Sequence, residues 1–510
     1  MIDRTVLLAA ALLAQPLMAL PALATPDQPF ARLAPSRPAV VEASWTPLRL
    51  PNGDSIALAG GSYLLAINDE WGFGPTVYGA AKGNYGGIFT VGFTAQRRWR
   101  LGQNTHLAAG FFAGAGGGLS SNELRFGGGL MLRPELSVRT EIGNWYVGAA
   151  LAQVSFPSGN VRGSSLGLVV GRSNSFASFA PADVGKLGRA STRTGLGFDE
   201  IALLGGLYQP SASTRNRSGQ PSTRRMGHAG ADLRQYIVDG SWWGVEAAGA
   251  AQGGADGYME MLGTLGQDWT LGHPRVRVGG QIGAGLGGGG NVDTGSGWLL
   301  RAGPTLRWIT PWGPTVRLDA GWTKAVSGQF AAQHLRVGLA FPLDVAPQWS
   351  GSMDGEAGIV RNSQVLASVQ HLPQVRFKDG SREAVSMLAV LMTREFSPSF
   401  YGVAQAGSAA VGKAGAYSFG LFGLGMQSPY VLGSTRFGAE LLAGAAGGGG
   451  VAVGGGAVMQ AEAWAAWEFG EADRLRLRTG LGYWRSLRDS SQASPMLNVS
   501  LGYAFGTLAR

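Results

Sequence analysis

The sequence predicts an all-β protein, a transmembrane antiparallel β-barrel of about 24 strands at roughly 20 residues per strand and connection. Segments such as Leu335–Phe341 and Val499–Phe505 alternate apolar and polar residues with the period of a strand. Only 14% of the 510 residues are charged and 45% are hydrophobic, whereas about a quarter of residues are charged in soluble proteins. These observations favour a chain whose alternate residues face lipid.

Three similar strands divide the chain into three related blocks. They end at Val170, Phe341 and Phe505, which lie 171 and 164 positions apart. Their last six residues read Ser-Leu-Gly-Leu-Val-Val, Arg-Val-Gly-Leu-Ala-Phe and Ser-Leu-Gly-Tyr-Ala-Phe. Self-similarity at a fixed spacing indicates a repeated structural unit.

On the last strand, the alternation separates a lipid face from a lumen face. We expect Val499, Leu501, Tyr503 and Phe505 to face lipid, and Asn498 and Ser500 to face the lumen.

The N-terminus predicts a secretion signal over residues 1–24. Arg4 supplies the positive charge, Thr5–Leu20 is the apolar core, and Ala22-Leu23-Ala24 is a small-residue cleavage site, so we expect cleavage after Ala24. Residues 25–53 are rich in Pro and Ala and predict a periplasmic lead-in.

The barrel is expected over residues 54–510, in blocks of about 54–171, 200–342 and 347–505. The polar segments 172–199 and 209–225 are long for hairpin loops, so we expect long loops or a plug there.

The signal, the absence of cysteine, the alternating strands and the closing segment Ser500–Phe505 resemble Gram-negative outer-membrane β-barrel proteins as a class. Proteins of that class tend to end on a strand with a terminal aromatic residue, which their assembly machinery reads. The resemblance implies that Gly502, Tyr503 and Phe505 form the assembly signal, although five residues follow Phe505 here. It also implies the cell outer membrane as location, with outer-membrane lipid and the barrel assembly machinery as partners.

Arginines at alternating positions predict a basic stripe along the lumen. Because a charge on the lipid face costs about 2–4 kcal/mol at the midplane, arginines between Leu and Val residues should point inward. The stripe comprises Arg275, Arg277, Arg317, Arg336, Arg474, Arg476 and Arg478. A basic lumen would favour anionic cargo. The alternative is an ordinary polar lumen, in which these arginines pair with carboxylates such as those of Asp319, Glu440 and Glu462.

Glycine-rich runs recur at similar distances before the three closing strands. They lie at Ala113–Gly118, Ile282–Gly287 and Ala443–Gly448. Such runs are typical of flexible hairpin tips, since glycine tolerates positive φ. They also suit a wall against which another segment packs closely.

Two architectures fit three blocks of about eight strands each. We expect one wide barrel, since the connection Asp344–Pro347 leaves little room to link separate barrels. A wide barrel open to both sides would leak, so it needs a plug or constriction. The alternative is three tandem 8-stranded barrels, whose lumens side chains would fill.

The single-barrel architecture predicts a channel or export conduit for a large or polymeric, anionic cargo, with a periplasmic export partner. The alternatives are a structural or anchoring outer-membrane protein without transport and an outer-membrane lipid hydrolase. None of the histidines lies in a nucleophile motif or has metal-ligand spacing; they are His106, His228, His273, His334 and His371. We therefore expect no enzyme, no catalytic, metal or cofactor site, and no nucleic-acid partner.

Overall fold

The computed structural model of the chain describes residues 30–509 except 119, 122, 345–355, 432 and 471–473. The expected signal peptide lies outside the described residues. Within the described part of the chain, no helix is long and apolar enough to cross a membrane.

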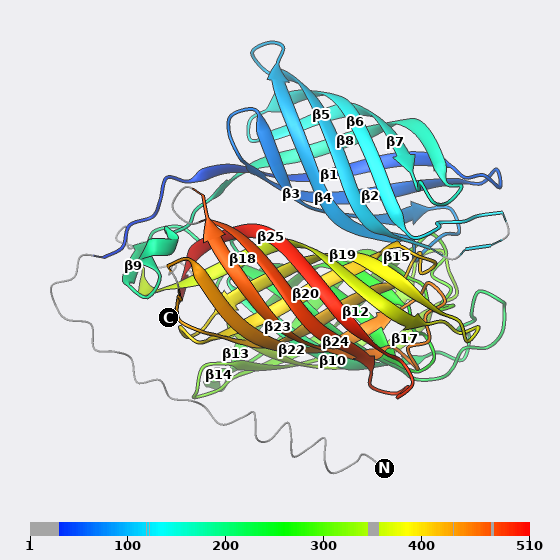
Figure 1. The fold of residues 1–510 in the computed structure, drawn as a ribbon. Helices are drawn as coiled ribbons and strands as arrows, with labels where there is room; N and C mark the ends of the chain where they lie inside the picture. The colour runs from blue at the N-terminus through cyan, green and yellow to red at the C-terminus, as the bar shows by residue number, and fades with distance from the viewer. Residues whose placement is uncertain are drawn as a thin grey trace. The chain divides into compact units, whose positions relative to one another are not determined.

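Three antiparallel barrels make up the described fold (Figure 1). The strands of barrel 1 are β1 (Arg37–Arg49), β2 (Ser55–Ala66), β3 (Trp71–Lys82), β4 (Phe89–Arg100), β5 (Thr105–Gly117), β6 (Leu130–Ile142), β7 (Trp145–Ser155) and β8 (Arg162–Phe176). Those of barrel 2 are β10 (Glu200–Pro210), β11 (Met226–Val238), β12 (Ser241–Gln252), β13 (Met259–Leu271), β14 (His273–Gly288), β15 (Trp298–Ile309), β16 (Thr315–Ala325) and β17 (Ala331–Pro342). Those of barrel 3 are β18 (Glu356–Arg376), β19 (Arg382–Glu395), β20 (Phe400–Val411), β21 (Ser418–Gln427), β22 (Thr435–Gly447), β23 (Ala457–Phe469), β24 (Leu475–Ser486) and β25 (Ala493–Ala509).

Each block closes on itself, so the expected single barrel of about 24 strands is wrong and the three-barrel alternative is correct. Strand β1 pairs with both β2 and β8, β10 pairs with β11 and β17, and β18 pairs with β19 and β25. Closure removes the two exposed edges that each block would otherwise present. Strand β17 ends at Pro342 and β18 begins at Glu356. Most of the connection Asp344–Pro347, on which the single-barrel expectation rested, lies outside the described residues.

The first strand lies inside the segment expected to be a periplasmic lead-in. On strand β1, the side chains of Val40, Glu42, Thr46 and Leu48 are buried and point inward. Because this inward face mixes apolar, charged and hydroxyl side chains, it shows no clear hydrophobic period.

The segment expected as a plug after barrel 1 is ordered outside the lumens. It continues β8 to Phe176, forms the 3-10 helix η1 (Pro181–Asp183) and ends with β9 (Leu187–Ala190). Strand β9 pairs with the N-terminal end of β18, and Phe179 bridges to Gly506 of β25. This segment therefore pairs with the N-terminal end of β18 and does not form the expected plug.

The second expected loop, residues 209–225, includes the end of β10 and then crosses one end of barrel 2. Asn216 bridges to Val292, and the Thr214 hydroxyl donates to the carbonyl of Ala331 at 2.7 Å. This loop thus lies against neighbouring turns of barrel 2.

Every barrel has two different ends. The chain enters and leaves at one end, which we call the terminal end, together with short turns such as residues 143–144 and 239–240. The opposite end, here the loop end, carries the longer connections, including residues 211–225 and 289–297.

The alternation of faces is confirmed along most of the closing strands. The outward side chains include Leu166, Leu168, Val170, Leu335, Val337, Leu339, Phe341, Val499 and Leu501, and the inward ones include His334, Arg336, Asn498 and Ser500. Tyr503 and Phe505 depart from the predicted lipid face, because Tyr503 is half-buried and Phe505 is buried. The ring of Phe505 packs edge-on against Phe176 of β8, with ring centroids 4.9 Å apart.

Candidate functional site

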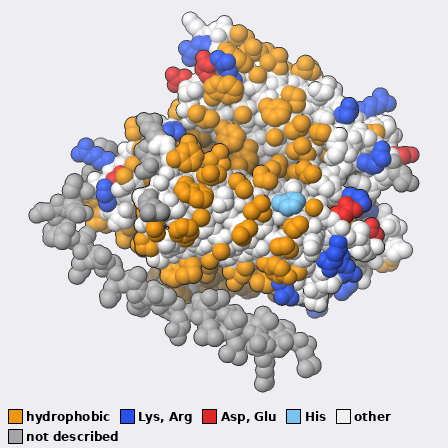
Figure 2. Space-filling view, viewed as in Figure 1, with side chains coloured by type: hydrophobic (Ala, Val, Ile, Leu, Met, Phe, Trp, Pro, Cys, Tyr) orange, Lys and Arg blue, Asp and Glu red, His pale blue; other side chains and the backbone are white. Residues whose placement is uncertain are grey.

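The barrel interiors are the candidate functional site, because they hold the buried ion pairs, whereas the outward side chains of the strands are mostly apolar. Outward side chains are mostly Leu, Val, Phe and Trp, as at Leu300, Trp308 and Leu441. Figure 2 shows hydrophobic side chains spread across this face of the molecule, with the charged ones mostly toward its margins. Such a wall can contact lipid, while the polar residues of the same strands turn inward.

The middle of barrel 2 is built around Arg301. Its guanidinium contacts the carboxylate of Glu246, the carboxylate of Glu260 at 2.5 Å and the hydroxyl of Tyr208. Glu246 also contacts Arg336, which in turn lies 3.4 Å from Asp319. These groups are almost fully buried, and a buried charge is tolerated only when it is paired.

The pairing continues toward the terminal end of barrel 2. Arg317 contacts Glu200 and lies 2.9 Å from Asp232. Arg307 lies 3.1 Å from Glu200 and 2.9 Å from Asp268. In the described part of the chain, interior ion pairs therefore link seven of the eight strands of barrel 2, all except β14.

Barrel 3 has a smaller ionic centre and more neutral side chains. Arg478 lies 2.6 Å from Glu440 and 2.9 Å from Glu462, and the Asn498 amide donates to Glu462 at 3.0 Å. Both amide atoms of Gln405, and those of Gln370, are buried without a partner among the described residues. Buried amides of this kind normally bind water, so Gln370 and Gln405 are sites at which water can bind.

Barrel 1 contains the least charge. Arg139 lies 2.8 Å from Glu42 and 3.4 Å from Glu135, and Arg133 lies 2.6 Å from Glu135. The Tyr146 hydroxyl donates to Glu42. These groups form one small network, which leaves the rest of the lumen to uncharged residues.

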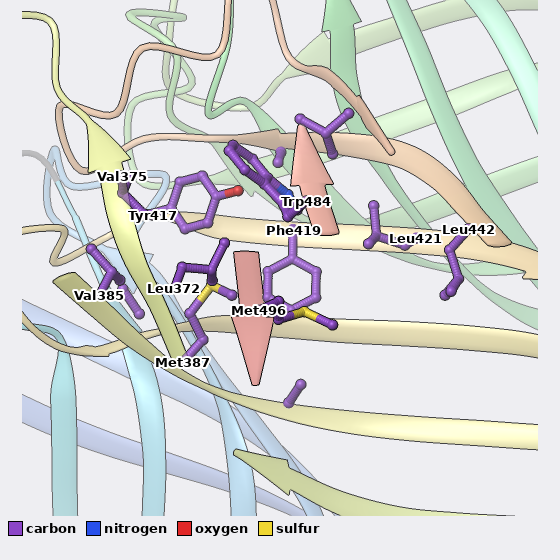
Figure 3. Packing of buried hydrophobic residues seen from close by; sticks show 14 of the residues in the cluster. Leu372, Val375, Val385, Met387, Tyr417, Phe419, Leu421, Leu442, Trp484 and Met496 are labelled. Carbon is purple, nitrogen blue, oxygen red and sulfur yellow. The ribbon is translucent and has the colours of Figure 1, made fainter. Parts of the chain in front are cut away.

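An apolar cap fills the loop end of each barrel. In barrel 3 the rings of Tyr417 and Trp484 meet edge to face at 6.3 Å, with Leu372 and Met387 packed close by (Figure 3). A cavity of about 10 Å³ remains within this cap, which is too small for more than one water molecule. The caps of barrels 1 and 2 are built on residues such as Phe126 and Phe330.

Four of the seven predicted stripe arginines lie inside the barrels. Arg317, Arg336, Arg476 and Arg478 are at most 2% exposed. They do not form one stripe, because two belong to barrel 2 and two to barrel 3. Their partners include Asp319, Glu440 and Glu462, the carboxylates that the polar-lumen alternative named.

The other three predicted arginines lie near the terminal ends. Arg275 is exposed, Arg277 pairs with Asp239 at 2.9 Å, and Arg474 donates to the Tyr503 hydroxyl at 2.6 Å. Of the proposed assembly signal, Tyr503 is therefore partly engaged by an arginine and Phe505 is packed against barrel 1. Gly502 lies where an added Cβ would meet the carbonyl oxygen of Val365 at 2.2 Å.

Sequence reasoning missed Arg301, Arg307 and most of the carboxylates. The signal was present, because Thr305 and Arg307 alternate with Leu306 and Trp308 along β15. What the sequence did not indicate is which acid would oppose which arginine, since that depends on how each barrel closes.

Among known proteins, only solved structures align with this chain. No protein-family model and no curated protein matches the sequence. Solved structures that align with it include OccK2 (OpdF) of Pseudomonas aeruginosa in complex with glucuronate, at 12% identity over 93% of this chain and 98% of that one, with a TM-score of 0.24. OccK8 (OprE) of the same species aligns at 10% identity over 93% and 98%, with a TM-score of 0.22. A BenF-like porin from Pseudomonas fluorescens Pf-5 aligns at 10% identity over 92% and 98%, with a TM-score of 0.22. At these TM-scores the argument for function rests on the chain's own geometry.

Proposed function

We propose that this chain is an outer-membrane β-barrel protein whose barrels provide narrow, gated passages for ions or small polar solutes. One observation carries the proposal: on strands of all three barrels, apolar residues face outward and polar residues face inward. An apolar outer wall matches lipid, and a polar, charged interior matches the path of a hydrated solute.

The orientation follows from the two kinds of barrel end. Outer-membrane barrels have short periplasmic turns and longer extracellular loops. We therefore assign the terminal ends to the periplasm and the loop ends, with their apolar caps, to the outside. Outer-membrane lipid is then the partner of the outer wall, and the barrel assembly machinery remains an expected partner.

A large or polymeric cargo does not fit these barrels. We therefore propose no periplasmic export partner, because that partner was expected only for such a cargo. Eight strands enclose a space that side chains fill. Passage therefore needs a cap to move, as in pores that hydrophobic constrictions gate by dewetting. We assign no catalytic step to the interiors.

Location is tested by fractionating a Gram-negative host that expresses the full chain. The mature protein should sediment with the outer membrane. Recovery in the soluble periplasmic fraction would exclude the proposal, because an apolar outer wall cannot remain exposed to water without aggregation.

Gating is tested by single-channel recording in planar bilayers. Trp484→Ala removes a large ring from the cap of barrel 3 and should raise the conductance or the open time. Trp467→Ala is the matched control, because Trp467 lies in barrel 3 but is 39% exposed on the outer side. Equal conductance in the two variants would argue against the cap as gate.

A structural or anchoring role is the second candidate, and the complete apolar caps favour it. If the wild-type protein and Trp484→Ala both lack conductance while sedimenting with the outer membrane, this candidate replaces the channel. Preference for anions stays a prediction. Replacing Arg474, Arg476 and Arg478 together by Gln should reduce it if a conducting lumen exists.

A further inference from the structure

Two glycine-rich turns occur at equivalent places in every barrel. The first, here the short glycine turn, joins the third and fourth strands at residues 83–88, 253–258 and 412–417. The second, the long glycine turn, begins at the end of the fifth strand and covers residues 116–129 (without 119 and 122), 288–297 and 447–456. The long turns of barrels 1 and 3 begin within the repeated glycine runs, and that of barrel 2 begins directly after the run Ile282–Gly287.

Barrel 1 contacts barrel 2 through its short turn. The backbone N–H of Gly86 donates to the carbonyl of Gly295 in the long turn of barrel 2 at 2.8 Å. The indole of Trp298 donates to the carbonyl of Ala81 at 2.9 Å. A Cβ added to Gly87 would lie 2.2 Å from the nitrogen of Gly289, so the two backbones touch.

Barrel 2 contacts barrel 3 in the same way. A Cβ added to Gly257, in the short turn of barrel 2, would lie 2.7 Å from the nitrogen of Gly448 in the long turn of barrel 3. At the margin of this contact, Arg488 donates to Gln252 at 2.8 Å. Lys378 pairs with Asp256 at 2.8 Å.

Barrel 3 contacts barrel 1 and completes the set. The N–H of Ala416, in the short turn of barrel 3, donates to the carbonyl of Gly116 at 3.2 Å. A Cβ added to Gly415 would lie 2.2 Å from the carbonyl oxygen of Gly127. The short turn of each barrel thus meets the long turn of the next, and the third barrel returns to the first.

The backbone conformation of these turns is repeated even where glycine is absent. Gly87, Gly257 and Ala416 occupy the same turn position with φ of 98°, 95° and 75°. The other non-glycine residue with positive φ in the described part of the chain is Asn291, in the long turn of barrel 2. Left-handed backbone is unfavourable for alanine. Ala416 nevertheless adopts it, which indicates that the contact between the turns requires this backbone conformation.

We propose that the glycine turns are joints that hold the three barrels together as a single-chain cyclic trimer. Each joint is heterologous, pairing a short turn with a different, long turn. Heterologous contacts close when the last unit meets the first. Because all three short and all three long turns are then occupied, no joint remains free for another copy of the chain. This inference does not depend on whether the lumens conduct.

Cross-linking in native membranes tests two of the joints. The chain has no cysteine, so introduced pairs are the sole thiols. In the full-length protein, Q252C/R488C should join barrels 2 and 3, and N84C/R217C should join barrels 1 and 2, because Arg217 reaches the carbonyls of Asn84 and Gly86. A short bis-maleimide and mass spectrometry of the linked peptides give the readout. N84C/D239C is the negative control, because Asp239 lies at the other end of β12 from the joint.

Valine substitutions then test whether the glycines make the joints. Gly87→Val should abolish the N84C/R217C link, and Gly257→Val should abolish the Q252C/R488C link. Gly53→Val and Gly380→Val are matched controls: both glycines have left-handed backbone, with φ of 87° and 89°, but nothing lies within 4 Å of an added Cβ. Heat-modifiable migration on gels reports whether the barrels themselves are folded.

The proposal is supported if the cysteine pairs cross-link in the parent proteins and if the links disappear with Gly87→Val or Gly257→Val but not with Gly53→Val or Gly380→Val. Absence of both links from the folded parent pairs would overturn it. Equal loss in the joint and control variants would also overturn it, because strain within a turn would then explain the loss.

Discussion

Barrels 2 and 3 share a strand number and an apolar cap but fill their interiors in different ways. Among the side chains that the structure describes, the strands of barrel 2 bury six carboxylates and five arginines, whereas those of barrel 3 bury four carboxylates and three arginines. These groups are Glu200, Asp232, Glu246, Glu260, Asp268, Asp319, Arg234, Arg301, Arg307, Arg317 and Arg336 in barrel 2, and Glu395, Glu440, Glu462, Glu468, Arg436, Arg476 and Arg478 in barrel 3. Barrel 3 also buries neutral amides, including Gln370, Gln405 and Gln460.

The two interiors suit different roles, rigid support of the barrel wall in barrel 2 and passage of a solute in barrel 3. A network of shared ion pairs braces the wall of barrel 2 and must be broken before anything passes. Neutral amides with free donors and acceptors can exchange partners with water at small cost. Barrel 3 is therefore the better candidate for a passage, and barrel 2 the better candidate for a rigid support.

The largest effect is expected in barrel 2, from Glu246→Gln. This carboxylate is shared by Arg301 and Arg336, so its loss leaves two buried guanidiniums each with one remaining acid, Glu260 or Asp319. Removing one partner of a buried ion pair costs about 3–5 kcal/mol. Urea titration in detergent micelles, followed by tryptophan fluorescence, should show this loss in the free energy of unfolding. A loss below about 1 kcal/mol, the value typical of exposed pairs, would mean that water already fills this lumen.

The sequence predicted that Arg336 and Ser500 face inward, because polar and apolar residues alternate along those strands. The sequence did not predict the number of barrels. Pairing of β1 with β8 or of β18 with β25 depends on which edges meet, and alternation is the same for one wide barrel and three small ones. Phe505 was misassigned because its neighbour across the contact, Phe176, is 329 positions away in the sequence.

A smaller loss in the free energy of unfolding is expected in barrel 3 from Arg478→Lys. This substitution keeps the positive charge but removes the planar guanidinium group. Arg478 lies between Glu440 and Glu462, and one ammonium on a flexible stem cannot reproduce the guanidinium geometry at both. We expect a loss of about 1–2 kcal/mol, the value of one or two charge-assisted hydrogen bonds. Arg478→Met should cost more, because it leaves two buried carboxylates without their shared cation. Equal losses for Lys and Met would show that geometry, rather than charge, stabilises this centre.

The smallest effect is expected from Gln405→Leu, and it decides whether the interior of barrel 3 differs in kind from that of barrel 2. Replacing a buried polar group that lacks a protein partner by an apolar group of similar size can be neutral or stabilising. We therefore expect the free energy of unfolding to change by less than about 1 kcal/mol. Any conductance should fall, because an apolar side chain would replace a site for water. The matched substitution in barrel 2 is Gln281→Leu, since the Gln281 side chain accepts a hydrogen bond from Arg234 at 3.3 Å. Its loss removes a partner from a buried charge and should cost more. If both substitutions lower the free energy of unfolding equally, the amides of barrel 3 are structural. Barrel 3 is then no better a candidate for the passage than barrel 2.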